Sequence, residues 1–147
     1  MINNSFIYLI VPFTTLILAQ IIKFIFESIK SKTLKWGRLF NGCGGMPSSH
    51  TSFCFSLAMY IGLKDGFDTN LFAISFVFSC IVMFDALGHR KESGHQAVAI
   101  NKMLDEFFSK DSKDGVKHLK EELGHNPSEV LGGIILGTLI AYIFYIL

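Results

Sequence analysis

The chain has 147 residues; half are apolar, 15 are phenylalanine and 17% are charged, which is the composition of a single membrane domain over residues 1–147. The formal net charge of +1 says little about partners, because the charges are unevenly placed, and no nucleic-acid partner is expected. The three cysteines have neither an even count nor metal-ligand spacing, so we expect no disulfide framework, no metal and no other cofactor.

Apolar stretches predict an all-α, integral-membrane bundle with about four crossing helices, over residues 6–29, 47–64, 70–88 and 127–147. Lys23 lies near the end of the first helix, where it would snorkel to the interface by default or else point inward at an anion. The third helix ends at Asp85, followed by Arg90 and Lys91. Because an acid inside a membrane helix is costly unless it is paired, we expect Asp85 to pair with a basic residue such as Arg90.

Between the third and fourth crossings, residues 94–108 alternate apolar and polar side chains at helical spacing. This pattern predicts an amphipathic surface helix, lying on the membrane or against the bundle. A short helix is expected over residues 116–123, with Gly124 as its C-cap.

Two helix starts share one pattern. The first is Gly44-Gly45-Met46-Pro47-Ser48-Ser49-His50, where the helix N–H groups attract anions and the two serines add hydroxyl donors, although an ordinary capped start explains it equally well. The second is His125-Asn126-Pro127-Ser128-Glu129-Val130, with Asn126 as N-cap and Glu129 in a capping box. On the helix that follows, Gly133 and Gly137 form a small-residue face for packing against a neighbouring helix or a second copy of the chain.

The basic residues orient the bundle. Twelve of the thirteen Lys and Arg residues lie from Lys23 to Arg38 or from Arg90 to Lys120, on the side of the first and third loops, so the positive-inside rule places these loops on the cytoplasmic side of the cell membrane. His50 and His125 both open helices from that face, and we expect their rings on the order of 5–8 Å apart around an anionic headgroup. One neutral imidazole would attack phosphorus while the other protonates the leaving oxygen, and basic side chains would hold the remaining oxygens.

These motifs, together with Asp85-Ala86-Leu87-Gly88-His89-Arg90-Lys91 and Gly94-His95-Gln96-Ala97 with Asn101, carry a family resemblance. Nearly the whole chain resembles the small bacterial and plant proteins of the divergent branch of the type 2 phosphatidic acid phosphatase and vanadium haloperoxidase superfamily. The resemblance implies a metal-independent lipid phosphatase in which His125 is the nucleophile, His50 the acid, and Glu129 the acid partner of the last motif. It also implies a phosphate site, for which the candidates are Lys23, Ser48, Ser49, Arg90 and Lys91.

The chain departs from the superfamily's pattern at three points. Ser49 replaces a glycine, Glu129 replaces an aspartate, and Leu119 stands where the last motif has an arginine. Basic residues elsewhere would have to replace the missing arginines, and the sequence does not say which. The alternative function is therefore a non-catalytic binder or carrier of anionic lipid headgroups, and a purely structural role is a third.

Overall fold

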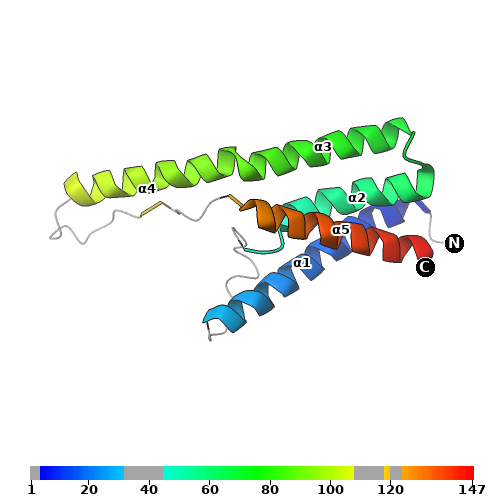
Figure 1. The fold of residues 1–147 in the computed structure, drawn as a ribbon, viewed down its shortest axis with the longest axis horizontal. Helices are drawn as coiled ribbons and strands as arrows, with labels where there is room; N and C mark the ends of the chain where they lie inside the picture. The colour runs from blue at the N-terminus through cyan, green and yellow to red at the C-terminus, as the bar shows by residue number, and fades with distance from the viewer. Residues whose placement is uncertain (1–3, 32–44, 108–117, 120–123) are drawn as a thin grey trace.

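A computed structural model describes residues 4–31, 45–107, 118–119 and 124–147, and these are all-α apart from short connections. A 3-10 turn, η1 (Asn4–Phe6), leads into five helices: α1 (Ile7–Ser31), α2 (Ser49–Asp65), α3 (Asn70–Leu87), α4 (His89–Phe107) and α5 (Pro127–Ile146). In Figure 1, α1 and α3 run one way and α2 and α5 run the other. The starts of α2 and α5 therefore lie toward the same end of the bundle, away from both chain termini.

Local capping sets the helix starts where the sequence predicts them. The Ser48 hydroxyl accepts the N–H of Thr51 at 3.4 Å, and the Thr69 hydroxyl accepts the N–H of Phe72 at 3.2 Å. Asn126 precedes Pro127, the first residue of α5, as expected for an N-cap. These caps satisfy amide donors that the first helical turn leaves without a partner.

Helix α2 lies at the centre, in contact with α1, α3 and α5. Its closest neighbour is α5, because a Cβ built on Gly133 would lie 2.8 Å from the Ser48 carbonyl oxygen, and one built on Gly137 would lie 3.0 Å from that of Ser52. The small-residue face of α5 is thus filled by α2 of the same chain. Of the two neighbours expected for Gly133 and Gly137, the structure shows a helix of the same chain, and a homo-oligomer stays a prediction.

Within the part of the chain that the structure describes, three stretches are long and apolar enough to cross a membrane: residues 7–29, 70–107 and 127–146. The expected fourth crossing, α2, has 17 residues, and its buried positions include five serines and threonines, namely Ser49, Thr51, Ser52, Ser56 and, at the cap, Ser48. The hydroxyls of Ser52 and Ser56 donate to carbonyls of their own chain segment, at 2.8 and 3.0 Å. A helix enclosed by three others does not need an apolar surface for lipid, which is why α2 differs from its neighbours.

The amphipathic helix expected after α3 is present, although it begins earlier than expected, and its position on the membrane stays a prediction. Helix α4 begins at His89 rather than residue 94, continues α3 outward in Figure 1, and among the described helices contacts only α3, so it does not lie against the bundle. The short helix over 116–123 is not formed at His118 and Leu119, and its other residues lie outside the described ranges.

Candidate functional site

The starts of α2 and α5 are joined by a backbone hydrogen bond. The N–H of Ser48 donates to the carbonyl oxygen of Glu129 at 2.8 Å. The Ser48 hydroxyl also accepts from both the N–H and the hydroxyl of Thr51, the latter at 2.9 Å. Ser48 thus serves as cap and as connection between two helices, and its N–H is engaged in that connection.

Lys23 points into the protein. Its side chain is 5% exposed, and its ammonium group donates to the Ser49 hydroxyl at 3.3 Å, at the first residue of α2. Lys23 thus points inward rather than snorkelling to the interface, which was the default expectation, and the anion expected beside it stays a prediction. A lysine ammonium is costly to bury in a membrane protein, so this position suggests a role in holding negative charge.

Glu27 belongs to the same face of α1, one turn after Lys23. A Cβ built on Gly45 would lie 3.2 Å from a Glu27 carboxylate oxygen, so this side chain reaches the segment that leads into α2. Gly45 has a φ of +89°, a conformation that suits glycine. Sequence reasoning did not single out Glu27; its spacing of four residues from Lys23 was the signal that would have found it.

His125 is buried between two helix ends. Its side chain is 5% exposed, and its backbone N–H donates to the carbonyl oxygen of Ala86 in the last turn of α3, at 3.0 Å. Asn126, the next residue, is the N-cap of α5, and its backbone N–H donates to the Glu129 carboxylate at 3.2 Å, which confirms the expected capping box. Glu129 consequently has a capping role, four residues from the candidate nucleophile.

The remaining candidates are less closely placed. His50 is the second residue of α2 and is exposed, and the distance between its ring and that of His125 stays a prediction. The Lys91 side chain is exposed. The side chain of Arg90 lies outside the described part of the chain, so its pairing with Asp85 also stays a prediction. The structure thus brings together Lys23, Ser49 and the two helix starts.

Comparison with known proteins identifies a family and one curated relative. The sequence profile of the Divergent PAP2 family matches residues 3–140, a range that contains both helix starts. The chain is 42% identical over 143 residues to a Bacillus subtilis (strain 168) protein named "Uncharacterized membrane protein YuiD", and the match covers 88% of this chain and 90% of that protein. No solved structure matches the chain significantly.

Proposed function

We propose that this chain, which belongs to the divergent PAP2 family, is an integral-membrane phosphohydrolase that cleaves a lipid phosphate or pyrophosphate monoester. The observation that carries the proposal is the buried Lys23 ammonium, which donates to the Ser49 hydroxyl at the start of α2. The start of α2 is in turn hydrogen-bonded to the start of α5, which directly follows His125. Helix N-termini and a buried cation favour a phosphate group. We place the site on the cytoplasmic face of the cell membrane.

Lys23 takes the place of the missing arginine in this proposal. Leu119, at the position of the last motif's arginine, has an apolar side chain that is 47% exposed and cannot bind phosphate oxygens. Lys23 instead supplies a compact positive charge, which lies beside the Ser49 hydroxyl at the start of α2. Because the charge is buried, its attraction to an anion is weakened little by water or salt.

The reaction divides into two displacements. A lone pair on a neutral His125 ring nitrogen attacks phosphorus, and the bond from phosphorus to the lipid oxygen breaks as that oxygen takes a proton from His50. A phosphohistidine and a lipid alcohol result. Water then attacks phosphorus while His50 accepts its proton. The P–N bond breaks, its electron pair returns to the His125 ring nitrogen, and inorganic phosphate is released. Lys23 and the start of α2 hold the non-bridging oxygens throughout.

The test is phosphate release by the purified protein from a panel of lipid phosphates, with and without vanadate. His125→Ala should lower turnover by several orders of magnitude while lipid-phosphate binding weakens far less. Lys23→Met should weaken binding, and Lys23→Arg should restore part of it, because the arginine keeps the charge. If Lys23→Met lowers stability but leaves phosphate binding intact, Lys23 is structural and the proposed site is wrong.

A non-catalytic binder of anionic lipid headgroups is the second candidate. Two positions of the superfamily's catalytic motifs, Ser48 and Glu129, are engaged in capping and joining helices, which a binder needs as much as an enzyme does. A binder predicts no phosphate release above background from any lipid, with modest changes in affinity on replacing either histidine. An enzyme predicts that His50→Ala slows poor leaving groups more than activated ones, since only the former need the proton.

A further inference from the structure

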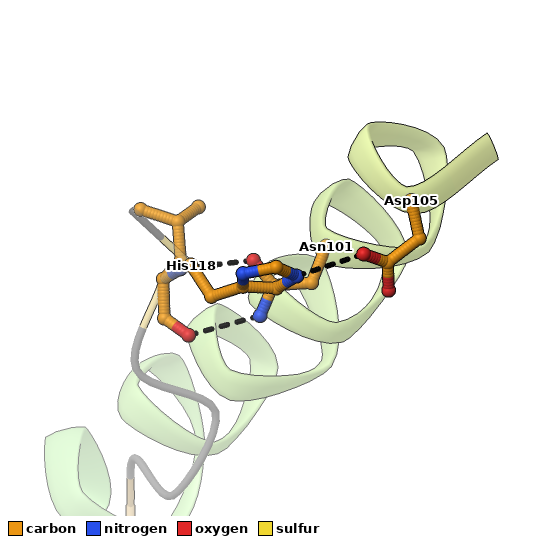
Figure 2. A network of polar contacts seen from close by, with 4 residues as sticks. Asn101, Asp105 and His118 are labelled. Carbon is orange, nitrogen blue, oxygen red and sulfur yellow. Dashed lines mark hydrogen bonds and ion pairs between the residues drawn. The ribbon is translucent and has the colours of Figure 1, made fainter. Parts of the chain in front are cut away.

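Asn101 on α4 holds a segment of chain that belongs to the region before α5. Its side chain is 3% exposed; the amide nitrogen donates to the Leu119 carbonyl oxygen, and the amide oxygen accepts the Leu119 N–H, both at 2.9 Å (Figure 2). One side chain thus satisfies both backbone polar groups of one residue. This pairing requires a donor and an acceptor side by side, which only an amide side chain provides.

A second contact lies at the other end of α4. Gly124 has a φ of +90°, and a Cβ built there would lie 2.6 Å from the backbone nitrogen of Lys91. The chain therefore passes directly against the backbone of α4's first turn, where no side chain fits. The next residue is His125, whose N–H donates to the Ala86 carbonyl oxygen. Gly124 and His125 together fix the chain to the α3–α4 junction.

Little chain separates the two contacts. Leu119 and Gly124 are five residues apart in sequence, and five residues span at most about 18 Å. The contact of Leu119 with Asn101 therefore limits how far Gly124 and the neighbouring His125 can move from α4.

One face of α4 is suited to this contact. Gly94, Ala97 and Asn101, at spacings of three and four residues, are all buried, although α4 packs against no described helix other than α3. Beside this contact, His118 Nε2 lies 3.0 Å from Asp105 Oδ1. Both side chains are exposed, so this pair adds little to the stability of the contact. Among the described residues, Asn101 is therefore the main polar anchor of the returning chain.

We propose that Asn101 is a positioning residue for His125: by holding Leu119 on α4, it keeps the His125 imidazole buried and oriented at the start of α5. The catalytic consequence rests on the proposed function, whereas the effect on the position of His125 does not. This assigns a role to α4, which carries none of the reacting groups. In this proposal α4 is a rigid support, against which Leu119 and Gly124 are held before the chain reaches His125.

The direct test measures how fast diethyl pyrocarbonate modifies His125 in the full chain in detergent, mapped by mass spectrometry. Asn101→Leu removes both hydrogen bonds to Leu119 and should raise the His125 rate about tenfold or more, since loss of two net hydrogen bonds shifts a local opening by that factor. Lys102→Leu places the same side chain at the next, exposed position and should leave the rate within about twofold of wild type. Exposed His50 is the internal reference.

An unchanged His125 rate in folded Asn101→Leu would overturn the proposal. If that variant does not fold, Asn101→Asp is used; it keeps the acceptor for the Leu119 N–H, lacks the donor, and should give an intermediate rate. An Asn101→Asp rate equal to wild type overturns the proposal as well.

Kinetics separate positioning from general damage. With phosphatidic acid in phosphatidylcholine vesicles, Asn101→Leu should lower kcat about tenfold and change KM less than about threefold, because Lys23 and Ser49 are untouched. In a His125→Gly background rescued by free imidazole, Asn101→Leu should have no further effect, since a diffusing imidazole needs no anchor. A further fall there would contradict the positioning role. Absence of phosphate release from wild type would reject the enzyme, and the modification experiment would still decide the role of Asn101.

Discussion

Replacing Gly133 by alanine should separate α5 from α2 and weaken the site. The added Cβ would lie 2.8 Å from the Ser48 carbonyl oxygen and 2.9 Å from the Thr51 Cβ, where ordinary contacts are 3.4 Å or longer. Neither atom is the far end of a flexible side chain, so the helices must shift. Overpacking of this kind costs about 1–3 kcal/mol.

Gly132→Ala is the matched control. Its Cβ would meet the terminal methyl group of Met46 at 3.0 Å, and Met46 is exposed and flexible enough to move aside. Both substitutions gain the same helix propensity, about 1 kcal/mol for glycine to alanine, so that contribution cancels in the comparison. The difference in unfolding free energy between the two variants is therefore the packing cost alone. At about 2–4 °C per kcal/mol for a chain of this size, Gly133→Ala should melt about 2–12 °C below Gly132→Ala.

The measurement is thermal unfolding in detergent, followed with a thiol-reactive fluorophore. Cys54 and Cys80 are half-buried reporters, and a Cys43→Ser background removes the third thiol. Gly133→Ala should also weaken the hydrogen bond from Ser48 to Glu129, and with it lipid-phosphate binding. Equal melting temperatures for the two alanine variants would refute the close approach of α2 and α5.

Two further predictions concern the opposite end of the bundle. Tyr8→Phe removes the phenol hydroxyl that donates to the two Asp65 carboxylate oxygens at 2.7 and 2.9 Å. Because the pair is exposed, the loss of unfolding free energy should stay below about 1 kcal/mol, and phosphate binding should not change. A loss of phosphate binding would contradict the separation of the two ends of the bundle. Lys64 lies in the second loop, on the membrane side opposite the proposed site. In a chain whose native cysteines are replaced, Lys64→Cys should therefore react with a membrane-impermeant maleimide added outside intact cells. Labelling only after permeabilisation would place the site on the outer face.

The helices were predictable because their signals are local. Serine, threonine or asparagine caps, a proline at a helix start and long apolar runs depend on neighbours in sequence, and the observed helices begin and end within a few residues of the expected bounds, α4 excepted. The start of α4 was not predicted because a glycine such as Gly88 indicates the end of a helix, whereas the chain resumes helical geometry at His89. A single glycine interrupts a helix only when its neighbours do not continue it.

The arrangement of the helices was not predictable in the same way. Hydropathy treats each apolar stretch as facing lipid, so it cannot show that α2 is enclosed by other helices. The same limitation applies to Lys23: its side chain could reach either the interface or the interior, and the choice depends on Ser49, which is 26 residues away in sequence. The contact between Asn101 and Leu119 is similarly invisible, since it pairs a side chain with the backbone of a residue whose own side chain carries no signal.

The enclosure of α2 and the geometry of the site have one physical cause. Three apolar helices shield α2 from lipid, which permits a serine-rich start whose hydroxyls are satisfied within the chain. The absence of side chains at Gly133 and Gly137 lets the backbone of α5 approach closely enough for the Ser48 N–H to reach the Glu129 carbonyl oxygen. That hydrogen bond sets the start of α5, and His125 immediately precedes it. A sequence that kept every polar residue of the two motifs but filled these glycine positions would therefore retain the candidate chemistry and lose the geometry on which it depends.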